Sequence, residues 1–491
     1  MLKKTLIILL VLAMLTTVFA GCKDDSQQTT GNNASSNDAA QADDRWKLPE
    51  LNYEGATVTI HTRGDDETVK EIGKDDDGSA LSSELYERTT ATEERLDVEI
   101  VISKQNSWSQ YSQTIRELRD SISTGKQSYD LVAGWSPRTP VLASEDLFYD
   151  LNQFDYFDSD DEWWSQSLVE ALTVNGKLYL ATGDISTTYM DGAFATIFNQ
   201  PLALSLGYNY STFYEVVTAG EWTLDYLYEL TKNVYQDNGN STRDDQDVYG
   251  LLFKESYNTQ AFWGGSDICI IENNGVDRPE INFEVEKLQN VYDKIYKLIH
   301  ENPGAVMNTS TKITEDVIEF FKQGNGLFLI QTLGTLSKLT DMTQDYGILP
   351  IPKYDTLQTN YYTHLHACTL WSVPRDAKDP EMSAAVLTSL AYDSNRLVVE
   401  PHYEKLLKAR YIKDSESGYM IDMIYNSINM NFDSIYNEAL GKSLSEKTTM
   451  PVFSFATLIS QNDGTSMSSW WNTNKDTIQA QFDTIMDGFY E

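Results

Sequence analysis

One stretch near the start of the sequence changes its hydrophobic period, and this change restricts the fold more than any other feature. From Leu81 to Leu96, side chains suited to burial recur at the spacing of one helical face. From Val98 to Ile102 they recur at every second position, and Ala56 to Ile60 alternates in the same way. A strand, a helix and a second strand in this order favour a parallel pair of strands. The sequence therefore predicts an α/β fold for this region.

Later segments extend this pattern along the chain. Tyr111 to Ile122 carries another helical stripe, and Tyr129 to Trp135 is a short apolar strand that runs into a loop. Val285 to Ile299 is predicted to be a long amphipathic helix. Asp379 before Pro380 is a well-formed helix start, because aspartate caps the first turn and proline fits within it. The chain is long enough for two or three ordinary domains.

The first 22 residues have the parts of a secretory signal. Lys3 and Lys4 precede a mostly apolar run, which ends in small residues just before Cys22. The run is shorter than the roughly 20 residues that a membrane-spanning helix needs. The junction "FAGC" resembles a bacterial lipobox, which implies a signal peptide over residues 1–21 and lipidation of Cys22, with palmitate expected among the acyl chains. The alternative is an ordinary signal peptide that contains a cysteine.

The segment after Cys22 is polar and acidic. Lys23 to Asp44 has no aromatic and no large aliphatic residue, so it cannot bury enough surface to offset its ordering entropy. We interpret residues 22–45 as a flexible tether with a reach of roughly 25 Å. The net charge of the whole chain is −37, which argues against a nucleic-acid partner and suits a soluble particle outside the cell.

Motifs for metals, cofactors and catalysis are weak or missing in the sequence. Asp237 to Gly250 suggests a calcium loop, but its sixth and twelfth positions are Thr242 and Val248, so a solvated loop is favoured. His364 and His366 would share one face of a strand, without further ligands nearby. We expect no metal site and no cofactor. Composition alone does not exclude a glycosidase, which needs only two carboxylates.

Two cysteines follow Cys22, at positions 269 and 368. Cys269 and Cys368 both lie in apolar surroundings, which favours buried free thiols over the alternative, a disulfide between them.

The order of segments resembles the extracellular solute-binding proteins that supply ABC importers, in particular the sugar-binding branch of the family 1 type. The resemblance spans nearly the whole mature chain. The crossover loop "TGDIS" departs from the pattern, because it lacks the proline often found there. The segments that carry the resemblance are "ELYERTTATEERLDVEI", "YDLVAGW", "GKLYLATGDISTTYMDGAFATIFN", "WTLDYLYELTKNVYQDNGNSTRDDQDVYG", "GNGLFLIQTLGTL", "YGILPIPKYD" and "SMSSWWNTNKDTIQAQFDTIMDGFY".

The resemblance implies a two-lobed periplasmic-binding-protein-like fold of type II. Two α/β lobes would be joined by two or three crossovers around a central cleft and would close on a ligand by hinge motion. The expected first lobe comprises residues 46–187 and 360–428, and the expected second lobe comprises residues 188–359 and 429–491. The chain is expected to act as a monomer and to deliver its ligand to the permease subunits of the importer.

Sugar recognition needs flat apolar faces for ring C–H groups and planar polar groups for hydroxyls. Trp263 is the sharpest candidate, because it stands beside Gly264 and Gly265 in a predicted loop. Each candidate has a packing or surface role as its alternative, and the pairs Trp163–Trp164 and Trp470–Trp471 are assigned to packing. The candidate ligand-binding residues are Arg63, Asp65, Trp135, Asp184, Trp263, Gln331 and Trp371.

The sequence thus predicts a substrate-binding lipoprotein without catalytic activity, held on the outer side of the cell membrane or in the periplasm. Its predicted ligand is a carbohydrate, in particular an oligosaccharide. Two alternatives remain at this point: an anchored extracellular glycoside hydrolase, and a ligand-binding subunit that reports to a sensor kinase.

Overall fold

The computed structural model describes residues 45–105, 111–307, 316–399, 401, 415–441 and 449–490. The chain divides into two units, Met1–Trp46 and Lys47–Glu491, and the fold described below is that of the second unit. The predicted signal peptide, the lipidation site Cys22 and nearly all of the predicted tether lie outside the described residues.

The first sheet contains the strand–helix–strand unit that the sequence predicts. Its strand order is β13-β3-β1-β2, with β1 parallel to both β2 and β3 and with β13 antiparallel to β3. Helix α3 begins after Ser79, whose hydroxyl accepts a hydrogen bond from the Ser82 N–H, and its buried face includes Leu85 and Leu96. The strands are β1 (Ala56–Arg63), β2 (Val98–Gln105), β3 (Leu131–Trp135) and β13 (Thr369–Ser372).

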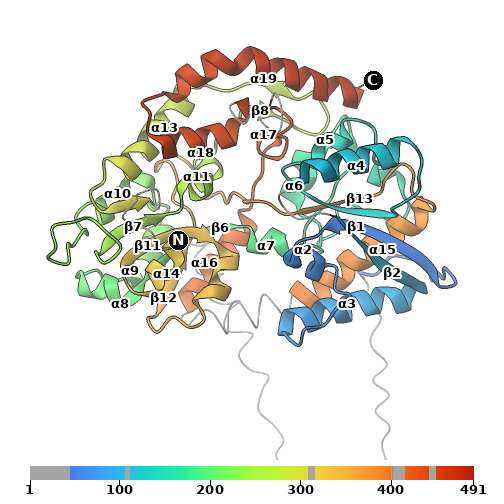
Figure 1. Cartoon of the computed structure of the whole chain (residues 1–491), viewed down its shortest axis with the longest axis horizontal. Helices are drawn as coiled ribbons and strands as arrows, with labels where there is room; N and C mark the ends of the chain where they lie inside the picture. The colour runs from blue at the N-terminus through green and yellow to red at the C-terminus, as the bar shows by residue number, and fades with distance from the viewer. Residues whose placement is uncertain are drawn as a thin grey trace, which may run out of the picture. The chain divides into compact units, whose positions relative to one another are not determined.

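Helices cover this first sheet, and the group is coloured blue to cyan with α15 in orange in Figure 1. Helix α15 begins after Asp379, whose carboxylate caps the Met382 N–H, as predicted, and it packs against α3. The elements of this group are α2 (Asp66–Glu71), α3 (Ala80–Leu96), α4 (Tyr111–Ser123), α5 (Pro140–Ala143), η3 (Leu151–Gln153), α6 (Gln166–Leu172), β4 (Thr173–Val174), β5 (Lys177–Leu178) and α15 (Pro380–Ser394).

The second sheet has the strand order β10-β7-β11-β6-β12. Strands β10, β7 and β11 are parallel, whereas β6 runs antiparallel to its neighbours β11 and β12. Every residue of β6 and β11 is buried, as expected for central strands covered on both faces. The strands are β6 (Phe194–Asn199), β7 (Tyr249–Phe253), β10 (Ala305–Met307), β11 (Gly326–Thr332) and β12 (Tyr346–Leu349).

Helices also cover the second sheet, and the predicted helix over 285–299 is α13, one of the elements of this group. A small ribbon, β8 (Ile271–Glu272) with β9 (Glu280–Ile281), precedes α13. The helices of this group are α8 (Gln200–Ser205), α9 (Ser211–Thr218), α10 (Leu224–Thr231), α11 (Glu255–Thr259), α12 (Ala261–Gly265), α13 (Val285–His300), α14 (Val317–Lys322), η4 (Leu333–Leu339), α16 (Ser415–Asn426), α17 (Phe432–Ile435) and α18 (Pro451–Gln461).

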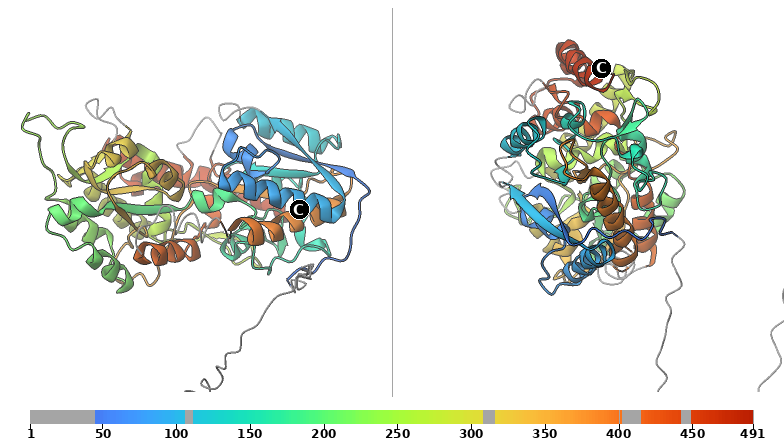
Figure 2. Two further views of the ribbon diagram at one scale, coloured as in Figure 1. Left: turned by 90° about the horizontal axis from the view of Figure 1, so that it is seen from below. Right: turned by 90° about the vertical axis from the view of Figure 1, so that its right-hand side faces the viewer.

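Among the described residues, two segments pass between the two groups and a third leaves the first group. The first contains α7 (Thr187–Asp191), which lies between the groups in Figures 1 and 2, and the second leads from β12 to β13. These two are paired, because the Phe194 N–H donates to the His364 carbonyl over 3.1 Å and the His366 N–H to the Gly192 carbonyl over 2.9 Å. The third leaves α15 through the π-helix η5 (Asn395–Val399). The fold thus agrees with two α/β lobes joined by two or three crossovers.

Two helices refine the predicted lobes. Helix α16 lies in the range expected for the first lobe, but it packs against β12 of the second sheet, and the Ser417 hydroxyl accepts the Ile348 N–H over 3.0 Å. Helix α19 (Met467–Tyr490) contacts α13, while its last turn reaches Tyr179 near the first sheet, so it spans both groups (Figure 1). The lobe boundaries as a whole stay a prediction.

Smaller predictions also meet the structure. Cys269 and Cys368 are free thiols, the first partly exposed and the second buried. Both tryptophan pairs are buried, although Trp163 and Trp164 precede α6 in a turn instead of lying within a helix. Within the described ranges, no helix combines the length and the apolar character that crossing a membrane requires.

Candidate functional site

Three of the predicted ligand-binding residues meet at one edge of the first sheet. Arg63 ends β1 and Trp135 ends β3, and these strands are parallel neighbours, so their carboxyl ends share an edge. The Arg63 Nε atom lies 2.6 Å from Asp65 Oδ1, and its Nη2 donates to Oδ2 over 3.0 Å. The Arg63 guanidinium also lies 5.4 Å from the centroid of the Trp135 ring. We name Arg63, Asp65 and Trp135 the strand-end cluster.

Two residues that sequence reasoning missed extend this cluster. The Arg138 guanidinium lies 5.7 Å from the Trp135 ring centroid, and its Nε atom is 2.7 Å from Glu438 Oε2. Arg138 stands three residues after Trp135, so its position in "GWSPR" was a usable signal. Glu438 lies 300 positions further along the chain, and no local pattern connects it to Trp135.

The second crossover and the second lobe contribute a further pair, which the positive charge of Arg63 influences. Tyr257 lies in α11, just after β7 ends, and its ring centroid is 4.2 Å from that of His366. Burial of the imidazole, together with the positive charge of Arg63, lowers the pKa of His366 to about 4. The imidazole is therefore neutral near pH 7. The Nδ1 atom of His366 is covered and has no hydrogen-bond partner among the described residues.

Gln331 is buried, and its side chain is bound by a chain neighbour of Tyr257. It belongs to the carboxyl end of β11, and its amide oxygen accepts from Asn258 Nδ2 over 3.4 Å and from the Thr332 N–H over 3.0 Å. Its side chain is bound by its own lobe, and Asn258 follows Tyr257 directly in the chain.

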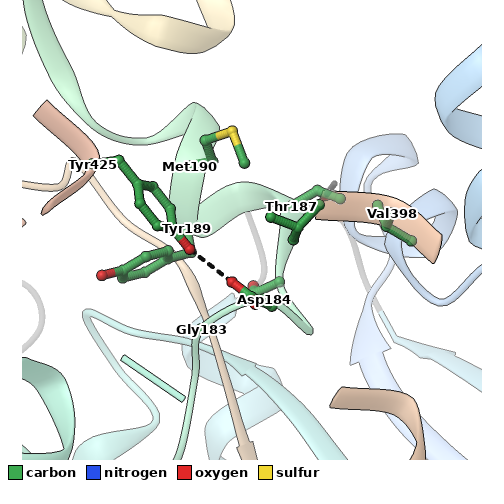
Figure 3. Close-up of a pocket in the computed structure, with 9 residues that line it drawn as sticks. Gly183, Asp184, Thr187, Tyr189, Met190, Val398 and Tyr425 are labelled. Atoms are coloured by element: carbon green, nitrogen blue, oxygen red, sulfur yellow. Dashed lines mark hydrogen bonds between the residues drawn. The ribbon is translucent and has the colours of Figure 1, made fainter. Parts of the chain in front are cut away.

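Asp184 belongs to a different place, a small pocket at the crossovers (Figure 3). Its carboxylate accepts hydrogen bonds from the Tyr425 hydroxyl and from Asn395 Nδ2, both over 2.7 Å. Burial raises the pKa of Asp184 to about 6. Because Tyr425 belongs to α16 and Asn395 to η5, this carboxylate joins the first and third crossing segments. The pocket is lined by Gly183, Asp184, Ser186, Thr187, Tyr189, Met190, Val398, Val399 and Tyr425.

The other two predicted tryptophans have no exposed ring. Trp371 lies in β13 with no measurable exposure. Trp263 lies in α12, is also fully buried, and donates its indole N–H to Asp433 Oδ2 over 3.2 Å. In this structure both side chains take the packing alternative, and neither offers a face to a ligand.

The glycines beside Trp263 explain why the sequence pointed elsewhere. A Cβ atom on Gly264 would stand 2.9 Å from His364 Cβ, and one on Gly265 would stand 2.5 Å from Ile351 Cγ2. Both positions therefore let α12 approach the second crossover closely. The absence of side chains serves packing inside the protein, where the sequence had suggested approach to a ligand.

In the acidic loop after α10, the Asp247 carboxylate is bound by groups of the same loop and of its flanks. The Asp247 carboxylate accepts from the Tyr235 hydroxyl over 2.9 Å and from the backbone N–H groups of Asn238 and Asp244. Across the part of the chain that the structure describes, no group of three or more His, Cys, Asp or Glu side chains is placed to hold a metal ion.

Several solved structures similar to this one are described as sugar-binding proteins or as complexes with sugars. A cyclo/maltodextrin-binding protein complexed with maltotetraose matches with a TM-score of 0.56 and 13% identity, over 87% of this chain and 97% of that one. The sugar-binding protein MalE of Xanthomonas citri matches with a TM-score of 0.57 and 10% identity, over 89% and 98%. This chain has the fold of the sugar-binding ABC solute-binding proteins.

A third similar structure comes from Staphylococcus aureus. The extracellular solute-binding protein of Staphylococcus aureus in complex with maltose matches with a TM-score of 0.54 and 12% identity, over 89% of this chain and 99% of that one. No protein-family model and no curated protein matches the sequence. The two-lobed α/β fold class predicted from the sequence is confirmed by these structures.

Proposed function

We propose that this chain binds a carbohydrate at the strand-end cluster and presents it to the permease subunits of an ABC importer, without catalysing a reaction. The observation that carries the proposal is the meeting of Arg63, Asp65 and Trp135 at the carboxyl ends of parallel strands. The similar solved proteins are described as holding maltotetraose or maltose. Carboxylate and guanidinium groups around an aromatic ring are the groups that sugar hydroxyls and ring C–H faces need.

Tyr257 and His366 would complete this site from the other side. The His366 ring contacts Tyr257 of the second lobe and lies within the electrostatic influence of Arg63 in the first. A ligand between them would contact both lobes and the second crossover. It would therefore stabilise the closed form by its differential affinity for that form.

The binding test is a calorimetric titration of maltose, maltotetraose and other linear and cyclic glucans. Trp135→Ala and Asp65→Asn should each weaken the binding of the best sugar by about 2 kcal/mol, roughly thirtyfold in Kd. Tyr419→Ala, on an exposed face of α16, is the matched control and should leave the affinity unchanged. If both cluster variants bind as the wild type does, the sugar site lies elsewhere. Sugars shortened during the incubation would favour a hydrolase instead.

Hinge closure is a separate part of the proposal, because a receptor for an importer must signal that it is loaded. Addition of the bound sugar should reduce the radius of gyration in small-angle scattering. Tight binding without compaction would contradict closure. The same measurement checks the proposed monomeric state through the forward scattering.

We also propose that lipid on Cys22 holds the folded unit at the outer surface of the cell membrane, or in the periplasm of a Gram-negative cell. The variant Cys22→Ser should move from the detergent phase to the aqueous phase, while its thermal melting stays that of the wild type. A variant that remains fully in the detergent phase would contradict the lipid anchor.

A further inference from the structure

Arg138 holds Trp135 from the side of the first lobe. Its backbone N–H donates to the Trp135 carbonyl over 3.0 Å, and its guanidinium lies 5.7 Å from the centre of the indole ring. A second guanidinium N–H donates to the hydroxyl of Ser112 in α4 over 2.6 Å. The indole and the guanidinium are therefore fixed to each other by contacts within one lobe.

The acidic partner of Arg138 is attached to the second lobe. Five residues before Glu438, the Asp433 carboxylate accepts the Trp263 indole N–H and the Ile270 N–H over 3.2 and 3.1 Å. One residue before Glu438, Asn437 accepts the Val452 N–H over 2.9 Å, at the start of α18. Helix α18 packs on α11, which follows β7 of the second sheet. Helix α17, just before Glu438, also contacts α6 of the first lobe, so Glu438 stands where the two lobes meet.

The ion pair between the two side chains is largely withdrawn from water. The Arg138 and Glu438 side chains are 16% and 14% exposed, and their charged atoms are 2.7 Å apart. Removing one partner of such a pair leaves the other charge poorly solvated, which costs far more than the loss of a surface pair. A Glu438 side chain that moves with the second lobe leaves Arg138 when the lobes separate, and the guanidinium beside the Trp135 ring then loses its acidic partner.

We propose that Arg138 and Glu438 are positioning residues that couple closure of the lobes to the orientation of Trp135. This proposal relies on the proposed function for the ligand that Trp135 contacts, but the contact between the lobes does not depend on any ligand. The pair contributes to the closed form before a sugar arrives, and it fixes the indole ring in the place where a sugar would meet it.

The test uses the ligand-free mature chain and two readouts, the radius of gyration from small-angle scattering and the tryptophan fluorescence spectrum. Glu438→Gln and Arg138→Gln should each increase the radius of gyration and shift the fluorescence. The double variant Arg138→Glu with Glu438→Arg should restore the wild-type radius. Arg138→Lys keeps the charge but not the planar guanidinium, so it should keep the radius and still change the fluorescence.

The matched control is Glu145→Gln, which breaks the ion pair with Arg119 on the surface of the first lobe. Its Nε–Oε2 distance is 2.5 Å and its side chains are 36% and 33% exposed, and both residues belong to one lobe. This variant should change neither readout. An unchanged radius in Glu438→Gln and in Arg138→Gln would overturn the inference, as would a charge-reversed pair that stays expanded while still folded.

Titration with maltotetraose then separates this inference from the proposed function. If wild type binds the sugar, Glu438→Gln should raise its Kd at least tenfold, while Glu145→Gln leaves the Kd unchanged. If wild type does not bind maltotetraose but the ligand-free variants have the expected larger radius of gyration, the inference stands and this sugar is the wrong ligand. If wild type binds the sugar and the ligand-free variants Glu438→Gln and Arg138→Gln keep the wild-type radius of gyration, the coupling is refuted and the proposed function stands.

Discussion

A substitution at Trp263 distinguishes a core residue from a ligand contact, because the sequence predicts a ligand contact there and the structure buries the side chain. The indole ring has no exposed surface and packs edge-on against Phe455, with ring centroids 5.4 Å apart. Its N–H donates to Asp433, whose other oxygen accepts the backbone N–H groups of Ile270 and Ile271. Loss of the ring therefore removes both packing and one donor from a buried carboxylate.

Two substitutions divide this loss into its parts. Trp263→Ala should lower the free energy of unfolding by about 3–5 kcal/mol, the range for truncating a large buried aromatic side chain. Trp263→Phe keeps most of the ring volume but leaves Asp433 without the indole donor, and should cost about 1–3 kcal/mol. The second value contains the lost hydrogen bond and a smaller cavity than the one that Trp263→Ala leaves.

Urea denaturation followed by circular dichroism gives the stability of each variant, and sugar titration gives its affinity. Trp135→Ala is the reference for the opposite behaviour, with weakened sugar binding and a smaller change in stability, because Trp135 is only partly buried. The core assignment is refuted if Trp263→Ala unfolds at the wild-type urea concentration while its sugar affinity falls. That pattern would mean that the ring faces the ligand in the bound state.

Three further changes test the crossovers and the buried histidine. Glu71→Ala should lower the free energy of unfolding by about 3 kcal/mol, since the Ser186 and Thr369 hydroxyls lose their buried acceptor. The control in urea denaturation is Glu87→Ala, at an exposed position of α3, and equal stability of the two variants would contradict this prediction. Gly192→Ala should lower the free energy of unfolding by about 1–3 kcal/mol in the same assay, because its Cβ would stand 2.4 Å from the Ala367 carbonyl oxygen. A change near zero would show that the backbone of the paired crossovers can shift to make room for a methyl group. Burial lowers the pKa of His61 to about 4, from its usual 6.5. As the pH falls from 6.5 to 4, the unfolded chain therefore binds a proton at His61 before the folded chain does, and the wild type should lose about 3 kcal/mol more of its free energy of unfolding than His61→Phe. Parallel curves of stability against pH for the two proteins would refute this.

The sequence could predict the elements whose burial follows a local period. Helix α3 and strand β2 follow from such a pattern, because their core-facing residues stand at fixed spacings in one short stretch. The strand-end cluster was also within reach. Two parallel neighbouring strands that end at the same level bring their last residues close together, and the register of β1 with β3 does this for Arg63 and Trp135.

The sequence could not predict contacts that depend on how distant segments return. Glu438 reaches Arg138 from 300 positions away, and no period or motif connects them. For the same reason α16 was expected with the first sheet, although its Ser417 binds a strand of the second. The glycines beside Trp263 were ambiguous in a further way. A glycine permits close approach, but the sequence does not say whether a ligand or another part of the backbone approaches.

The crossovers show how the fold restricts the motion on which the proposed function depends. Glu71, which is fully buried, accepts hydrogen bonds from Ser186 on the first crossover and from Thr369 at the end of the second, so both are fixed to the first lobe. Beyond these points the crossovers pair with each other along Gly192 to Phe194. The paired segment therefore connects the second sheet to the first lobe, and the Asp184–Tyr425 hydrogen bond to α16 is a second connection. We propose that closure is a rotation about this paired segment, and that the Arg138–Glu438 contact lies where that rotation would bring the lobes together.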